Sequence, residues 1–170
     1  MLQVETFHIK DWEESYSGLV LAENDSWVLV QHIPMDYAID GYRLYRKEFV
    51  VHRERGEWET RIEKVLSLKN TKAKPPEGFA FSNTLAVLQK IEENYGLFEF
   101  QDTSEGEVFY GKLKEVKDKH LFTIDFINPD GSVDHEFTYD FDLRKLITIT
   151  FLSDYFHSMV LLWKDGLGQS

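Results

Sequence analysis

The chain has 170 residues, of which 42% are hydrophobic and 15% aromatic, and its formal net charge is −11. This composition excludes an intrinsically disordered protein, because disordered chains lack the apolar residues that build a core. The absence of cysteine excludes disulfides, thiolate metal sites and cysteine nucleophiles. The net negative charge argues against a protein whose whole surface binds nucleic acid.

The start of the chain, Met1 to Glu5, has neither the basic segment nor the apolar run of a secretory signal. The longest apolar run, Met159 to Trp163, is far shorter than the roughly 18 residues that a membrane span needs. We therefore expect a cytoplasmic protein that does not associate with membranes. No phosphate-binding, dinucleotide-binding or serine-hydrolase motif occurs, so we expect no cofactor and no enzymatic activity.

In chain order, the first half predicts a set of short strands followed by a helix. Gly18–Val30 is rich in β-branched residues and is interrupted by the turn residues Asn24-Asp25-Ser26, which is typical of a hairpin. A further strand is predicted at Phe49-Val50-Val51. The spacing of Trp58, Ile62 and Leu66 then predicts a helix.

A connector is predicted around Pro75-Pro76, because proline donates no backbone hydrogen bond and favours extended neighbours. We therefore divide the chain into a first unit (1–70), a linker (71–81) and a second unit (82–170). The formal charge of residues 1–75 is −2 and that of residues 76–170 is −9, which sum to −11.

The second half repeats the pattern after an extra helix. That helix is predicted from Ser82-Asn83 to the residue before Gly96. Strands are expected in 111–126, 137–143 and 147–151, with turns at 117–119 and 128–131. The spacing of Tyr155, Met159 and Trp163 predicts a last helix, with Ser153 or Asp154 as its N-cap.

The two halves align with each other. A shift of 93 residues matches Val4–Gln31 to Leu97–Ile124 without a gap. The matched pairs are Phe7 with Phe100, Tyr16 with Phe109, Gly18 with Gly111, Val20 with Leu113 and Asp25 with Asp118. This shared pattern favours an internal duplication, and chance similarity between two β-rich stretches is the alternative.

The glycine, the alternating strand and the Asp-containing turn of each half resemble the first motif of Sm-like proteins. Arg55-Gly56 resembles the Arg-Gly of their second motif. The resemblance implies an α+β, mainly β fold with short helices and two small barrels in tandem. The asparagine with which Sm proteins contact a base is absent, since Trp27-Val28 and His120-Leu121 stand in that region.

Residues 40–47 interleave aromatic and basic side chains. Alternation along a strand places Tyr42 and Arg46 on one face and Arg43 and Tyr45 on the other. Aromatic rings beside arginines can stack bases or hold acidic peptides, whereas a charged edge strand is the structural alternative. The candidate ligand-binding residues are Trp12, Tyr42, Arg43, Tyr45, Arg46, Arg53 and Arg55.

A second group of polar residues lies in the second half. Its carboxylates do not have the spacing of a calcium-binding loop, so a solvated acidic face is expected and no metal site. His135 beside Asp134 or Asp140 is the one arrangement that suggests acid–base chemistry. The carboxylates of this group are Asp125, Asp130, Asp134, Glu136, Asp140 and Asp142.

Three functions follow from these patterns. The first is a non-catalytic protein-binding or scaffolding module that uses exposed strand edges. The second is binding of RNA or single-stranded nucleic acid through the basic-aromatic residues of the first half. The third is an enzyme that uses His135. The sequence leaves the oligomeric state open.

Overall fold

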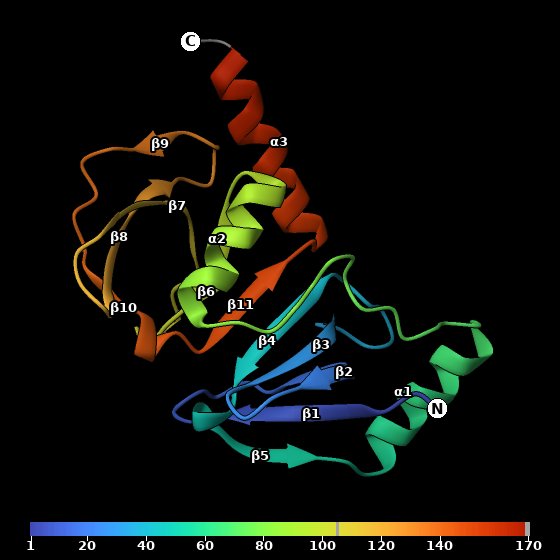
Figure 1. The fold of residues 1–170 in the computed structure, drawn as a ribbon. Coiled ribbons are helices and arrows are strands. Elements are labelled where there is room, and N and C mark those ends of the chain that lie inside the picture. Colours follow the sequence, from blue (N-terminus) through green and yellow to red (C-terminus); the bar gives the residue numbers. More distant parts are fainter. Residues whose placement is uncertain (105, 169–170) are drawn as a thin grey trace. The chain divides into compact units, whose positions relative to one another are not determined.

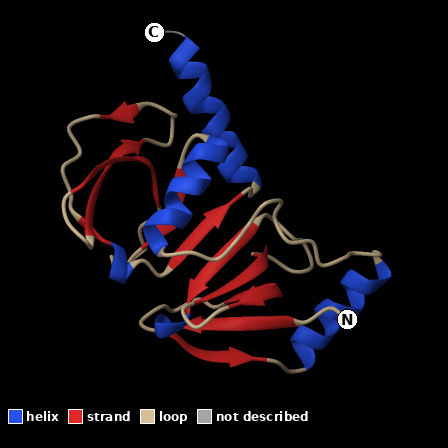
Figure 2. Cartoon of the chain, in the orientation of Figure 1, coloured by secondary structure: helices blue, strands red, loops and turns tan. Residues whose placement is uncertain are grey.

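The computed structural model describes residues 1–104 and 106–168 and is mainly β, with three short α-helices (Figures 1 and 2). The chain divides into two compact units, unit 1 (Met1–Ala80) and unit 2 (Phe81–Ser170). Each unit contains an antiparallel sheet and helices of its own. Among the described residues, no helix has both the length and the apolar character needed to cross a membrane.

Unit 1 is a five-stranded antiparallel sheet followed by one helix. Its sheet has the order β4-β3-β2-β1-β5. The elements are β1 (Val4–Ile9), β2 (Tyr16–Glu23), β3 (Trp27–Ile33), β4 (Tyr42–Arg46), the 3₁₀ helix η1 (Lys47–Phe49), β5 (Val50–Glu54) and α1 (Glu57–Leu68). The described residues of β4 and β5 do not pair with each other, so the sheet is open and does not close into a barrel.

Helix α1 packs against one face of this sheet. Ile62 and Leu66 lie four residues apart on the helix and are buried against Val4, Leu19 and Ile33. The predicted helical spacing is therefore confirmed.

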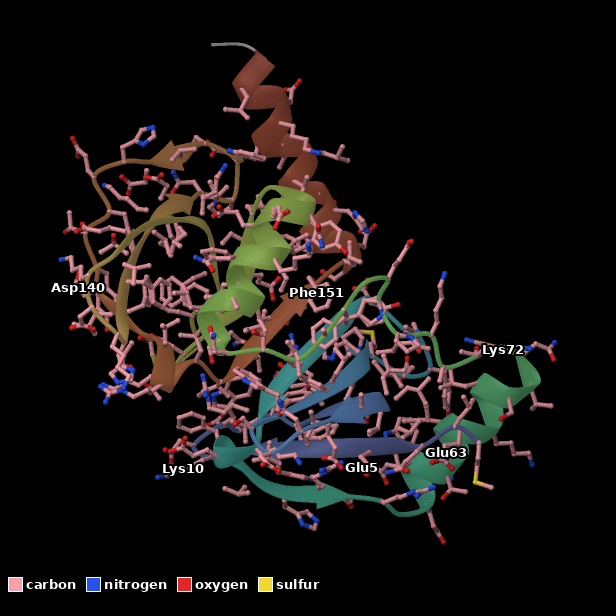
Figure 3. The ribbon with its side chains drawn as sticks, viewed as in Figure 1. Glu5, Lys10, Glu63, Lys72, Asp140 and Phe151 are labelled. Atoms are coloured by element: carbon pink, nitrogen blue, oxygen red, sulfur yellow. The ribbon has the colours of Figure 1, made fainter. Side chains whose placement is uncertain are left out.

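Polar contacts from α1 join it to β1. The backbone N–H of Val4 donates to Glu63 Oε1 over 2.9 Å, and Thr6 Oγ1 donates to the buried Glu59 carboxylate over 2.5 Å. Figure 3 labels Glu63 on this helix and Glu5 on β1.

Unit 2 contains a similar sheet with two helices. Its sheet has the order β10-β8-β7-β6-β11, and β9 pairs with β8. The elements are α2 (Thr84–Tyr95), β6 (Phe98–Gln101), β7 (Phe109–Val116), β8 (Leu121–Ile127), β9 (Val133–Asp134), β10 (Phe141–Asp142), the 3₁₀ helix η2 (Leu143–Lys145), β11 (Thr148–Phe151) and α3 (Asp154–Gly168). In the described part of the chain β10 and β11 do not pair, so this sheet is also open.

The predicted ends of α2 and the predicted start of α3 are confirmed. Asn83 accepts a hydrogen bond from the N–H of Ala86, and Gly96 ends α2 in the left-handed region with φ 98°. A side chain at Gly96 would collide with the ring of the buried Trp163 on α3. Ser153 caps α3 by accepting from the N–H of Phe156 over 3.0 Å.

The predicted strand at 137–143 is wrong over most of its length. Only Phe141–Asp142 is a strand, and it ends where Asp142 accepts a hydrogen bond from the N–H of Arg144 and starts η2. The aromatic residues that produced the alternating pattern pack on Phe141 from a loop instead. The ring centroids of Phe137 and Tyr139 lie 6.0 and 4.8 Å from that of Phe141.

The two units have the same internal pairing. Each has an antiparallel meander of four strands whose first strand also pairs with the fifth, and a 3₁₀ helix precedes the fifth strand. Gly18 pairs with Glu5 and His32, and Gly111 pairs with Phe98 and Phe126. Both second strands carry a register shift at the same place, so that Leu21 and Lys114 are skipped.

The register also corrects the predicted alignment at the hairpin turn. The turn oxygen that caps the backbone belongs to Asn24 in unit 1 and to Asp118 in unit 2, so Asp25 is not the counterpart of Asp118. The residue inserted in unit 2 therefore lies in this turn. The offset between equivalent residues changes there from 93 to 94, and it is 96 at Tyr45 and Phe141.

Candidate binding site

The inward face of each sheet is curved enough for strands that are not neighbours to touch. In unit 1 the rings of Phe7 on β1 and Tyr45 on β4 stack with centroids 4.6 Å apart. In unit 2 the equivalent rings of Phe100 on β6 and Phe141 on β10 lie 5.0 Å apart, edge to face. These two pairs mark the same place in the interior of the two units.

The composition of this inward face differs between the units. In unit 2 it is aromatic at Phe98, Phe100, Phe109, Phe126 and Phe141. At the equivalent register positions unit 1 has Glu5, Phe7, Tyr16, His32 and Tyr45. Only one of these five side chains, Phe7, lacks a polar atom.

Four side chains of unit 1 form what we call the polar cluster: Tyr16, His32, Arg43 and Tyr45. The Arg43 guanidinium carbon lies 5.2 Å from the ring centroid of Tyr16 and 5.8 Å from that of Tyr45. The Tyr16 and His32 rings are 5.7 Å apart. The cluster draws on β2, β3 and β4, because these neighbouring strands bring residues distant in sequence to one face.

The cluster reaches from the interior toward the surface. Tyr45 is fully buried and His32 is 4% exposed, whereas Tyr16 and Arg43 are half-buried. Half-buried Trp12, in the turn before β2, meets the Tyr16 ring edge to face with centroids 6.5 Å apart. Tyr16 Oη donates to the exposed Glu14 carboxylate over 2.8 Å.

Two deeply buried polar atoms of the cluster make no hydrogen bond to any described residue. They are Nδ1 of His32 and Oη of Tyr45. A buried donor or acceptor without a partner destabilises the folded state by about 1–3 kcal/mol. Such groups call for an explanation, and the usual ones are strain, a bound water or ion, or a role in binding or catalysis.

The electrostatics leave Arg43 as the cationic member of the cluster. Burial, together with the charge of Arg43, lowers the pKa of His32 to about 2, so its imidazole is neutral near neutral pH. Burial raises the pKa of Tyr45, and Arg43 opposes that rise. Burial and the bond to Glu14 raise the pKa of Tyr16. The cluster therefore presents one cation beside neutral groups that can donate hydrogen bonds.

Three of the seven predicted site residues lie at this cluster and four lie elsewhere. Trp12, Arg43 and Tyr45 are brought together. Tyr42, on the opposite face of β4, donates its hydroxyl to the carbonyl of Lys74 over 2.8 Å. Arg46 lies over the Trp27 ring, with its guanidinium carbon 4.4 Å from the centroid.

The remaining two predicted arginines are held in ion pairs. Arg53 donates to the carboxylates of Glu5 and Glu23 over 2.5 and 2.8 Å. Arg55 pairs with Glu63 over 3.1 Å. The four predicted arginines therefore do not converge on one face.

Tyr16 and His32 were missed as site residues by the sequence patterns. Tyr16 was matched to Phe109 as one more aromatic residue, and His32 lies just beyond the aligned segment. One signal could have found them. At each of these positions unit 2 has phenylalanine where unit 1 has a residue that can form hydrogen bonds, once the two units are aligned by their strand pairing.

Several acidic residues of unit 2 have local partners. Asp140, labelled in Figure 3, pairs with Lys117 over 2.8 Å, and Asp142 pairs with Arg144 over 2.7 Å. His135 is 77% exposed at its side chain and lies 3.7 Å from Asp125. In residues 1–104 and 106–168, no group of three or more acidic or histidine side chains is arranged to hold a metal ion.

A shallow groove lies at the start of α1 in unit 1. It is lined by Arg55, Gly56, Glu57, Thr60, Arg61 and Lys64. Three of these residues are basic, so the groove has positive charge at the surface.

No protein-family model matches the chain, and neither a curated protein nor a solved structure is detectably similar to it.

Proposed function

We propose that the chain is a non-catalytic protein-binding module and that its partner contacts the polar cluster of unit 1. The observation that carries this proposal is the pair of buried atoms without hydrogen bonds, His32 Nδ1 and Tyr45 Oη, on a face that is aromatic in unit 2. Natural cores do not retain such atoms without a compensating benefit. Binding to a partner is such a benefit.

The rim of the cluster supports a macromolecular partner. Its half-buried members are Trp12, Tyr16 and Arg43. Tryptophan, tyrosine and arginine are the residue types that dominate the binding energy of protein interfaces. Trp12 and Arg43 both contact the ring of Tyr16, so the three side chains are positioned before a partner arrives.

The test is a capture experiment from native lysate with nuclease treatment, using the wild-type chain and two tryptophan variants. Trp12→Ala removes the rim aromatic, and Trp58→Ala removes a surface tryptophan of α1 that is 41% exposed. We expect a stoichiometric protein that the wild type and Trp58→Ala retain and Trp12→Ala loses. Equal recovery with all three proteins, or no protein at all, would contradict the proposal.

Nucleic-acid binding is the second candidate, and the basic groove at the start of α1 is the observation that favours it. This function requires RNA to bind with an affinity that falls steeply as salt rises, because cations released from the phosphates drive the association. Substituting both Arg61 and Lys64 by alanine should abolish it and leave the capture through Trp12 unchanged.

We also propose that the two units are related to Sm-like proteins, each with an open and curved sheet in place of a closed barrel, and that they arose from one duplicated unit. The common strand order, the register shift at the same place and the equivalent aromatic pair support a common origin. An experimental structure tests it. Residues of unit 1 should superpose on the residues of unit 2 that lie 93, 94 or 96 positions later in the chain. A different strand pairing in either unit would end the proposal.

A further inference from the structure

We propose that His8 and His52 form a binding site for a divalent transition-metal ion, Cu²⁺ above all, on the edge of the unit 1 sheet. The proposal is carried by the strand register of the two histidines, the distance between their rings and the carboxylate of Glu54 beside them. It is independent of the polar cluster, because His8 and the inward-facing Phe7 are neighbours on β1 and so point to opposite faces of the sheet.

The strand register brings the two imidazoles to one face. His8 on β1 and His52 on β5 are direct partners, and residues directly opposite in an antiparallel pair have Cβ atoms about 4.5–5.5 Å apart. β5 is the edge strand of the unit 1 sheet (Figure 1). The His8 side chain is 37% exposed and His52 is exposed, so an ion in solution can reach both rings.

The distance between the rings fits two ligands of one metal ion. A metal that binds two imidazole nitrogens at about 2.0–2.1 Å holds their ring centroids about 5 Å apart. The observed distance between the His8 and His52 centroids is 5.4 Å. A β-bulge lies directly beside the pair, because Ile9 pairs with Val50 and Val51 is skipped. Bulges of this kind re-aim side chains and are common beside functional sites.

Glu54 prepares His8 for a metal ion. Its Oε2 lies 3.0 Å from His8 Nε2, so the carboxylate accepts a hydrogen bond when the ring proton is on that nitrogen. The other ring nitrogen, Nδ1, then carries the lone pair that a metal binds. Histidines that bind metals commonly donate their second N–H to a carboxylate, which fixes the tautomer and makes the ligand more basic.

Copper(II) is the ion that suits this pair best. Imidazole nitrogens bind copper, zinc and nickel, and Cu²⁺ forms the tightest complexes among the divalent first-row ions. The carboxylates of Glu54 and of Glu59, which interacts electrostatically with His8, add negative charge that attracts a cation. The described residues contain no group of three or more metal-binding side chains, so water completes the coordination of the ion.

The experiment is an NMR titration of the full chain with copper(II) sulfate, near neutral pH and in a buffer that does not bind copper. Paramagnetic Cu²⁺ broadens the signals of nuclei close to it. Of the six histidines in the chain, His8 and His52 should lose their ring signals first, below one equivalent of Cu²⁺. Simultaneous loss of all exposed histidine signals, or first loss at another histidine, would overturn the proposal.

Matched variants separate the pair from single surface histidines. His8→Asn and His52→Asn should each weaken Cu²⁺ binding by at least about tenfold, because each removes one of two linked ligands. His135→Asn is the control, since the His135 side chain is 77% exposed beside Asp125 and contacts no second histidine among the described residues. Unchanged affinity in both variants of the pair would refute the site. The wild-type titration needs no variant, so it stands if one of them misfolds.

Two further measurements test the chemistry of the site. Mg²⁺ should cause no shift of the His8 and His52 ring signals at the same concentrations, because this hard cation prefers oxygen ligands. Glu54→Gln should weaken Cu²⁺ binding by about tenfold while the same two rings still respond first. An equal response to Mg²⁺ would contradict a site for transition metals, and full affinity in Glu54→Gln would contradict the role of Glu54.

Discussion

Units 1 and 2 pair their strands in the same order and register, but they fill the inward face of the sheet with different chemistry. Unit 2 uses phenylalanine at positions where unit 1 has Glu5, Tyr16, His32 and Tyr45. Aromatic residues at these inward-facing positions are therefore sufficient for the common strand order. The polar residues of unit 1 are not required by the fold, so they are the ones to connect with function.

The largest expected effect is a loss of stability, and it tests whether the two units share one arrangement of the core. Phe7→Ala and Phe100→Ala should each lower the free energy of unfolding by about 3–5 kcal/mol, because both rings are fully buried. Urea denaturation measures the change. Val51→Ala, at a site that is 65% exposed, is the control and should change stability by less than about 0.5 kcal/mol. A small effect at only one of the two phenylalanines would show that the two positions are not equivalent.

The next effect concerns the two equivalent glycines. A Cβ at Gly18 would lie 2.5 Å from Val30 Cγ2, and one at Gly111 would lie 2.8 Å from Ile124 Cδ1. Gly18→Ala and Gly111→Ala should therefore each destabilise the chain by about 1–3 kcal/mol through overpacking. Gly166→Ala, where a Cβ meets nothing within 4 Å and φ is not positive, is the control and should not destabilise the chain. If Gly18→Ala were neutral in thermal unfolding, the close approach of β2 and β3 would not be required.

A reciprocal exchange sharpens the difference between the interiors. Tyr45→Phe should stabilise the chain by about 1 kcal/mol, since it removes a buried hydroxyl that makes no hydrogen bond. Phe141→Tyr should destabilise it by about the same amount, because it introduces such a hydroxyl. Both changes are measured by urea denaturation. Destabilisation by Tyr45→Phe would mean that the hydroxyl has a structural role in unit 1.

The smallest effect depends on pH. Burial opposes ionisation of Glu59, but hydrogen bonds from the Thr6 hydroxyl and the Gly56 N–H outweigh it and hold the pKa of this carboxyl below its usual value of 4.5. The resulting stabilisation is present above pH 4.5 and is lost as the pH falls through the lowered pKa of the folded state.

Glu59→Gln should remove this pH dependence and cost up to about 1 kcal/mol near neutral pH. The measurement is the midpoint of thermal unfolding as a function of pH, compared with Glu57→Gln at an exposed position of the same helix. A variant with the pH profile of the wild type would exclude the proposed role of Glu59.

Much of the fold could be predicted from local signals. The three helices follow from apolar spacing with caps such as Asn83 and Ser153, and the hairpins follow from turn residues. The strand at 137–143 could not be predicted, because alternating aromatic residues also arise when several rings pack on one ring, as Phe137 and Tyr139 do on Phe141.

The site was harder to predict than the fold. Arg43 and Tyr45 were found because they are two residues apart on one strand, and such spacing is visible in sequence. Their contact with Tyr16 and His32 depends on the pairing of β2, β3 and β4, which sequence spacing does not specify. The ion pairs of Arg53 depend in the same way on β1 and β5 lying side by side, together with a carboxylate from the end of β2.

The register shift shared by β2 and β7 has a consequence for engineering. A bulge of this kind fixes which residues face inward, since a slip of one residue would turn every inward side chain outward. The hairpin turn beyond it is already one residue longer in unit 2 than in unit 1. The β2–β3 turn is therefore a permissive position for a grafted epitope or fluorophore, because added length there leaves the order of the strands behind it unchanged.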